Sequence, residues 1–163
     1  MRSIPDPGFP SDDGSAVPAV AVALREVAAG APVHVAIAAL CEARVLVPVV
    51  AMPGEVESDS AGQARDKTAD MAAVLLTGGD GRRALLAFSD LTALQTWDAQ
   101  ARPVPVPTRD AARAALAEGA DALVVDVAGP VQVPIEGDTL RRVAAGQRPV
   151  RDAAGWAWAA PVQ

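Results

Sequence analysis

The residues whose types could do chemistry are few, and the single histidine and the single cysteine come first. His34 and Cys41 lie seven residues apart. In a helix this spacing is two turns, a rise of about 10.5 Å, whereas a nucleophile and its base need heavy atoms within about 3 Å. In a strand the odd spacing places the two side chains on opposite faces. The sequence therefore predicts a buried thiol and a half-exposed imidazole, and no catalytic dyad.

The sequence has few residues suited to other nucleophilic chemistry or to metal binding. The same histidine would have to serve any Ser-His-Asp triad, and the chain has no G-x-S-x-G motif. One cysteine and one histidine do not make the three or four ligands of a zinc site. Glu55, Glu57 and Asp59 alternate and could offer oxygens to Mg²⁺ or Ca²⁺, but they lack the glycine and final glutamate of an EF-hand. We interpret them as a solvated acidic loop and expect no metal and no cofactor.

Three glycines raise the possibility of a phosphate-binding loop. Gly78, Gly79 and Gly81 follow an apolar run. A P-loop continues into a helix and ends in G-K-[ST], whereas here a second apolar run follows and the lysine is absent. The glycines are therefore interpreted as a hairpin turn. Arg82 and Arg83 are interpreted as exposed residues at the start of the second strand, with an anion site as the alternative.

Two polar or aromatic groups are the candidate binding residues. Asp66, Lys67 and Asp70 place the only lysine between two acids just before a central strand. They form either a recognition point or a solvated ion pair worth less than about 1 kcal/mol. Trp156 and Trp158 are two apart, so in an extended chain both point to one side. Either the rings fold back onto the protein itself, or residues 155–160 pair with the edge of a partner's sheet.

The elements that must position these residues centre on a hairpin followed by a short helix. The strands are Met71–Leu76 and Arg83–Phe88, and Ser89 is the expected N-cap of the helix. Val45–Ala51 is an apolar strand in which Pro48 predicts a bulge or a position next to an edge. Three prolines place Arg102–Pro107 at an edge or on the surface.

The remaining pattern predicts helices on both sides of this hairpin in the sequence. Ser15 is the expected N-cap of a helix that ends at Gly30, and Pro32 opens a second helix. Thr108 and Asp138 are the expected N-caps of later helices. The other predicted elements are a helix over 109–118, an apolar strand over 122–127, an edge strand over 131–135 and a helix over 139–145.

Length and composition predict one α/β (α+β) domain with a mixed sheet of about five strands, an N-terminal helical pair and short helices packed on the sheet. The chain has 163 residues, of which 51% are hydrophobic, enough for its own core. We expect a flexible leader over 1–14, the domain over 15–146 and a C-terminal tail over 147–163.

Charge and hydropathy restrict the environment and the partners. The net charge of −6 opposes binding to nucleic acid, whose phosphates demand cations. Apolar runs fall short of the roughly 20 residues that cross a bilayer. The proline- and acid-rich start does not resemble a signal peptide. With a single cysteine, the sequence predicts a cytoplasmic protein that binds neither nucleic acid nor membrane.

Three stretches together carry a family resemblance. They are VLVPVVA, then DKTADMAAVLLTGGDGRRALLAFSDLTALQTWDAQARPVPVP, then AARAALAEGADALVVDVAGP. Over Val33–Ile135 the chain resembles the N-terminal domain of the SseB family, common as stand-alone proteins in actinobacteria. The resemblance implies a small α/β domain with a mixed sheet and brings no catalytic residues.

The functional hypothesis from the sequence is a non-catalytic module that binds another protein or forms a homo-oligomer. It depends on the poor catalytic inventory, the proline-interrupted edge strands and the apolar tail. The alternative is a regulatory domain that binds a small metabolite near Lys67 and the 53–66 loop; that the metabolite is related to amino acids is implied by the family resemblance alone. An enzyme that uses only carboxylates and arginines is the third hypothesis.

Overall fold

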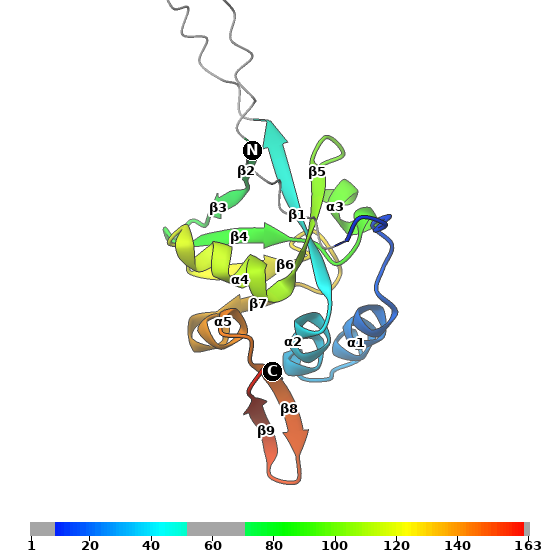
Figure 1. Cartoon of the computed structure of the whole chain (residues 1–163), viewed down its shortest axis with the longest axis vertical. Helices are drawn as coiled ribbons and strands as arrows, with labels where there is room; N and C mark the ends of the chain where they lie inside the picture. The colour runs from blue at the N-terminus through cyan, green and yellow to red at the C-terminus, as the bar shows by residue number, and fades with distance from the viewer. Residues whose placement is uncertain (1–8, 52–70, 162–163) are drawn as a thin grey trace, which may run out of the picture.

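The structure, a computed structural model, describes residues 9–51 and 71–161, which form helices and strands in alternating groups (Figure 1). In chain order the elements are α1 (Pro18–Ala28), α2 (Val33–Cys41), β1 (Arg44–Ala51), β2 (Met71–Ala73), β3 (Leu75–Thr77), β4 (Arg83–Ala87), α3 (Leu91–Trp97), β5 (Arg102–Pro107), α4 (Thr108–Ala117), β6 (Ala122–Val125), β7 (Val133–Glu136), α5 (Gly137–Ala144), β8 (Arg148–Asp152) and β9 (Gly155–Ala159).

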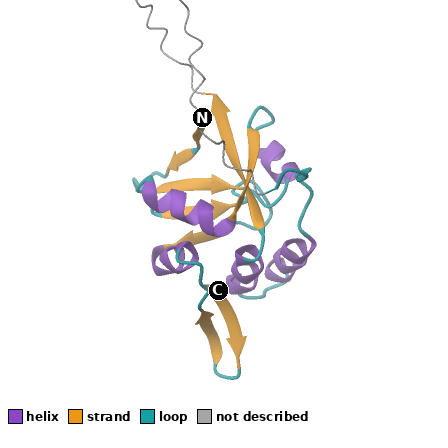
Figure 2. Ribbon diagram, viewed as in Figure 1, coloured by secondary structure: helices purple, strands orange, loops and turns teal. Residues whose placement is uncertain are grey.

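Two sheets build the body, and they meet where β1 crosses the end of β4. One sheet has the order β2-β1-β5 and the other β3-β4-β6-β7, with β4 and β6 parallel and the other pairs antiparallel. Leu46 and Phe88 join the sheets through two backbone hydrogen bonds of 2.8 Å. The predicted α+β class with mixed strand directions is confirmed, and the strands are divided between two bridged sheets (Figure 2).

The predicted hairpin forms, but its first strand is shared between the sheets. β2 pairs with β1, and β3 pairs with β4 after a break at Val74. The glycine turn closes with a hydrogen bond of 3.0 Å from the Gly81 N–H to the Gly78 carbonyl. Gly81 has a φ of +82°, which glycine adopts without strain. A strand follows this turn, so the hairpin interpretation is correct.

The prolines of β5 occupy positions where a missing N–H does no harm. The backbone of Leu46 bonds to Phe88 in the other sheet, so its pair with Pro105 on β5 is not hydrogen-bonded. Hydrogen-bonded and non-hydrogen-bonded pairs alternate in an antiparallel ladder. All three prolines of β5 therefore lie at non-hydrogen-bonded pairs, where the backbone nitrogen points away from β1. β5 is therefore an edge strand, as predicted. Pro48 faces Pro103, another pair of this kind, and the register passes through it without the bulge that was one of two predicted solutions.

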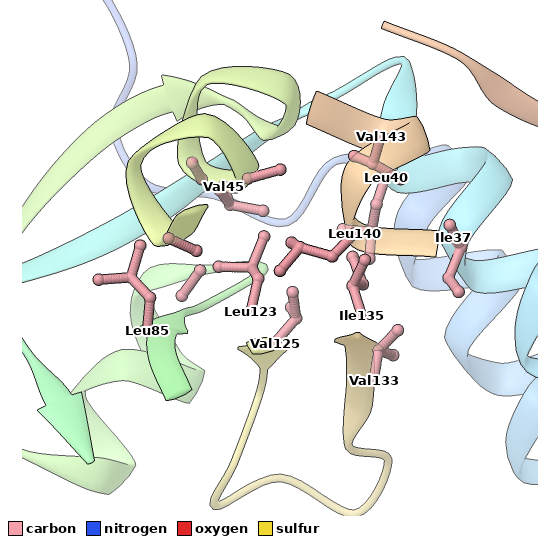
Figure 3. Close-up of a cluster of buried hydrophobic side chains, with 14 of the residues drawn as sticks. Ile37, Leu40, Val45, Leu85, Leu123, Val125, Val133, Ile135, Leu140 and Val143 are labelled. Carbon is pink, nitrogen blue, oxygen red and sulfur yellow. The ribbon is translucent and has the colours of Figure 1, made fainter. Parts of the chain in front are cut away.

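The larger core lies between the β4-β6-β7 face and the helices α2, α4 and α5 (Figure 3). Its fully buried side chains include Leu40, Val45, Leu85, Leu123, Val125, Ile135 and Leu140. A smaller cluster on the opposite face combines Leu46, Leu86, Phe88 and Leu94. Alternate residues of β4 enter the two clusters, so both faces of this strand are covered and its apolar run is explained.

The predicted N-caps are wrong for all four helices. α1 begins after Val17 with a proline in its first turn and no side-chain cap, so Ser15 does not cap it. Asp90 caps α3 by accepting a 2.7 Å hydrogen bond from the Ala93 N–H, and the preceding Ser89 is engaged elsewhere. The C-terminal prediction is better, since Gly30 follows α1 with a φ of +108°.

The other two predicted caps serve tertiary or side-chain contacts. The Thr108 hydroxyl donates to the Ala43 carbonyl at 3.1 Å and so ties the start of α4 to the connection between α2 and β1. The Asp138 carboxylate pairs with Arg142 at 2.6 Å, one turn along α5. Both residues lie in the first turn of their helices, and each side chain has a partner other than the free N–H groups of the helix start.

The C-terminal segment forms a hairpin that extends from the body below α2 and α5 (Figure 1). β8 and β9 pair antiparallel, with Asp152 opposite Gly155 at the turn and Arg148 opposite Ala159 at the base. The tryptophan segment is a strand, as one prediction held, but its partner β8 was not predicted.

Candidate functional site

A cavity opens at the carboxyl ends of β4 and β6, between α1 and α3. Its volume is about 350 Å³, and its lining is mainly apolar. The apolar walls come from Val17, Val20 and Leu24 of the α1 region and from Ala93 of α3. The carboxyl ends of parallel strands are a common place for ligands in α/β sheets.

The floor of this cavity carries a buried polar pair. Ser89 follows β4 and Asp126 follows β6, and they are 6% and 5% exposed. The Asp126 carboxylate accepts hydrogen bonds from the Ser89 N–H at 2.8 Å and from the Ser89 hydroxyl at 2.6 Å. Burial raises the pKa of Asp126, and the two hydrogen bonds oppose that rise in part. The pair thus ties together the ends of two adjacent parallel strands.

Asp126 also has an unusual backbone. Its φ is +59°, the left-handed region that non-glycine residues seldom adopt, although Asp and Asn tolerate it better than most. This conformation starts a turn in which the Gly129 N–H donates to the Asp126 carbonyl at 3.0 Å. The turn carries the chain from β6 around one side of the cavity, since Gly129 belongs to the lining.

The segment before α1 is fastened across the same end of the sheets. Arg44, about 5% exposed, bonds to the Asp12 carboxylate and to the carbonyls of Ser15 and Ser89. The Arg44 guanidinium lowers the pKa of Asp12. The Gly14 carbonyl accepts a 2.8 Å hydrogen bond from the first N–H of α3. These contacts hold the segment before α1 in place, and Ala16 at its end lines the cavity.

The lining of the cavity offers mostly apolar contacts and few polar groups. The lining has no histidine or cysteine, and its carboxylates at Asp90 and Asp126 are engaged as a helix cap and in the Ser89 pair. Among the described residues no group of three His, Cys, Asp or Glu side chains could hold a metal ion. An apolar ligand with a small polar end suits this lining.

The histidine and the cysteine lie apart, as predicted. The Cys41 thiol donates to the Gln147 carbonyl at 3.8 Å, and burial raises its pKa to about 11. The His34 ring stacks on Trp156 with 5.4 Å between ring centroids. The two side chains of α2 therefore contact the segments that lead into and form the C-terminal hairpin.

The two tryptophans of β9 contact different helices. Trp156 lies against His34 of α2, and the Arg142 guanidinium of α5 sits 5.5 Å from the centroid of the Trp158 ring. Trp158 also packs against the larger core, yet both indoles remain only half-buried. The hairpin is anchored by one face of β9, and the alanines of the strand occupy the other face.

The remaining candidate residues either lie outside the described residues or have partners within the protein. Asp66, Lys67 and Asp70 lie outside the described residues, as do the acids at 55, 57 and 59. Arg82 pairs with Glu136 at 2.7 Å, and Arg83 donates to the carbonyl of Glu118 at 2.7 Å. Both arginines thus have partners within the protein, which weighs against an anion site.

Sequence reasoning missed the Ser89–Asp126 pair. The available signal was the position of each residue directly after an apolar strand, since the ends of adjacent parallel strands come together. This position did not identify the pair, because Ser89 also fits the pattern of a helix N-cap and was assigned that role.

Comparison with known proteins confirms the family resemblance. The family model described as SseB protein N-terminal domain matches residues 19–142, more than half of the chain. No curated protein and no solved structure matches the chain. Every helix within residues 9–51 and 71–161 is too short or too polar to span a bilayer.

Proposed function

The chain belongs to the SseB family, and we propose that it is a non-catalytic module that binds another protein or a second copy of itself. The C-terminal hairpin carries this proposal. An isolated two-stranded hairpin is marginally stable in water, and here the hairpin extends from the body (Figure 1). It carries two half-buried indoles. Apolar surface of this kind on an exposed element marks contact sites.

The electrostatics of the hairpin agree with a protein partner. Residues 153–160 carry no charge in a chain of net charge −6. A neutral apolar strand avoids the desolvation of charges that makes interfaces costly. Aromatic residues such as tryptophan are enriched among the side chains that dominate binding energy. The same composition offers nothing to nucleic acid or to an anionic membrane.

The test compares the full chain with one that ends at Ala154 and with Trp156→Ser. Trp156→Ser leaves Trp158 on the core, so its melting temperature reports whether the hairpin still folds. We expect association, measured by light scattering and by capture of protein from the native host, to be lost in both variants. Full association in both variants at an unchanged melting temperature would exclude the hairpin as the contact site.

The cavity favours a second candidate function, a regulatory domain that binds a small metabolite. Its volume of about 350 Å³ falls within the range of ligand pockets, and it lies at the carboxyl ends of β4 and β6. Thermal-shift screening with amino acids and nucleotides tests this role. A specific rise of several degrees that Ala93→Trp abolishes would support it, because the larger side chain fills the cavity.

The other sequence-based predictions stand as proposals. The domain limits of 15–146, a leader over 1–14 and a cytoplasmic location rest on the sequence pattern and the single cysteine. Asp66, Lys67 and Asp70 are proposed as a recognition point. Lys67→Ala should weaken partner capture without changing the melting temperature, and unchanged capture would remove these residues from the proposal.

A further inference from the structure

The outer edge of β9, on the side away from β8, has no neighbouring strand among the described residues. We propose that β9 pairs antiparallel with β9 of a second copy, so that two hairpins form a four-stranded sheet across a two-fold axis. This inference rests on the proposed function and names its partner. Among the described residues, β9 pairs only with β8, and its other edge has no strand beside it.

The register identifies which backbone groups face that edge. Pro149 has no N–H, so its pair with Trp158 is not a doubly hydrogen-bonded one. The two-residue turn between Asp152 and Gly155 closes on a hydrogen-bonded pair. Counting alternate pairs from this turn also makes the Trp156 and Trp158 pairs non-hydrogen-bonded. The N–H and C=O groups of Trp156 and Trp158 therefore point away from β8. They are the free donors and acceptors of the edge.

Two other edge strands, β5 and β8, are protected against such pairing. On β5 the outward positions are the three prolines, which have no donor. On β8 the outward positions are Pro149 and Arg151, a missing donor and a charge, and α2 lies against this strand. β9 has neither proline nor charge between residues 155 and 159. An edge without these devices pairs with other strands unless a partner covers it.

The sequence of β9 is complementary to itself. Around Ala157 it reads Trp-Ala-Trp in either direction. When Ala157 lies opposite Ala157 of a second copy, each Trp156 lies opposite Trp158 of the other chain. Both members of this pair have outward N–H and C=O groups, so the two pairs form four hydrogen bonds. The same surface serves on both chains, as a closed two-fold interface requires.

Geometry and charge both allow this arrangement. In antiparallel order the two hairpins point in opposite directions, so the two bodies lie at opposite ends of the shared sheet. Opposed tryptophans on one face add aromatic cross-strand contacts. The segment that pairs is uncharged, so the net charge of −6 on each chain acts only at longer range. Salt should therefore strengthen the dimer.

Disulfide cross-linking tests the register in the full chain with Cys41→Ala. Ala157 opposite Ala157 is a non-hydrogen-bonded pair with about 4.5 Å between Cα atoms, within the range that a disulfide spans. Ala157→Cys should give a covalent dimer on mild oxidation. The matched control is Ala159→Cys on the same face. Its two cysteines would lie about 13 Å apart along the strands, so it should stay monomeric on a non-reducing gel.

Light scattering of the unmodified chain completes the experiment. The proposal expects twice the mass of one chain at high concentration and selective cross-linking at position 157. A monomer at every concentration would overturn the proposed dimer. The proposed function would then still hold with a different protein as the partner. A dimer that cross-links equally at 157 and 159, or at neither, would show that the copies meet elsewhere, and would also overturn it.

Discussion

The buried carboxylate of Asp126 gives the sharpest test of how the two parallel strands are held together. It accepts two hydrogen bonds from Ser89, and its backbone has a φ of +59°. Asp126→Ala removes both acceptors and leaves an alanine in the left-handed region. Asp126→Asn keeps an oxygen for the Ser89 N–H and offers its amide to the hydroxyl. Asparagine also tolerates this backbone conformation.

The expected losses differ in size. Each hydrogen bond to a charged group contributes about 1.5–3 kcal/mol, and alanine in the left-handed region costs about 1–2 kcal/mol more. Removing a buried charge offsets part of this loss, so we expect Asp126→Ala to lower the free energy of unfolding by about 2–4 kcal/mol. In a domain of this size that is a fall of roughly 10 °C in melting temperature. Asp126→Asn should melt at or above the unmodified protein at pH 7.

The pH dependence separates this explanation from a merely steric one. Because burial raises the pKa of Asp126 above its unfolded value, its contribution to stability is full below about pH 3.9, the unfolded value. The contribution is lost as pH rises through the raised pKa. Melting temperatures from pH 3 to 8 should show the advantage of Asp126→Asn growing with pH. A constant difference, or an Asn variant as unstable as Ala, would refute the reasoning.

Three further predictions test the core, the thiol and the segment before α1. Val125→Ala should lower the free energy of unfolding in urea by about 2–3 kcal/mol, and the partly buried Leu75→Ala by less than half as much; equal losses would contradict the observed packing. Cys41, with a pKa of about 11, should react with iodoacetamide at pH 8 about a hundredfold more slowly than a free thiol. Gly14→Ala should cost about 2 kcal/mol in thermal melting, because φ is +80° and the new Cβ would lie 2.8 Å from a Leu91 carbon. The control Gly79→Ala has open space, and its melting temperature should hardly change.

Local patterns predicted the strands well because the order of apolar and polar residues in each strand follows which of its faces are buried. The alternation over β7, with Val133 and Ile135 buried and Pro134 exposed, matches the expected half-exposed edge. The apolar run of β4 reflects cover on both faces. What the pattern did not show was the division of residues 71–77 between two sheets. Nothing in those residues marks Val74 as the break, which depends on where β1 and β4 lie.

The cavity and the buried polar pair were beyond the reach of local patterns. Ser89 and Asp126 are 37 positions apart, and only the parallel pairing of β4 and β6 brings them together. Arg44 precedes the strand predicted over Val45–Ala51, and its contact with Asp12 depends on a segment expected to be a leader. Polar residues that make tertiary contacts do not recur at a regular spacing in the sequence, so their partners can be identified only from the folded structure.

The prolines show how an apparent conflict in a sequence becomes evidence about neighbours. Pro48 and the alternating prolines of β5 seem to oppose a sheet, yet each lies at a pair where no hydrogen bond to the other strand is needed. The three prolines of β5 remove donors from the outer edge of the sheet and prevent further pairing there. By the same reasoning, a strand that keeps all its outward donors is one whose pairing is tolerated. β9 is such a strand, and its contrast with β5 and β8 is the physical basis for expecting a partner there.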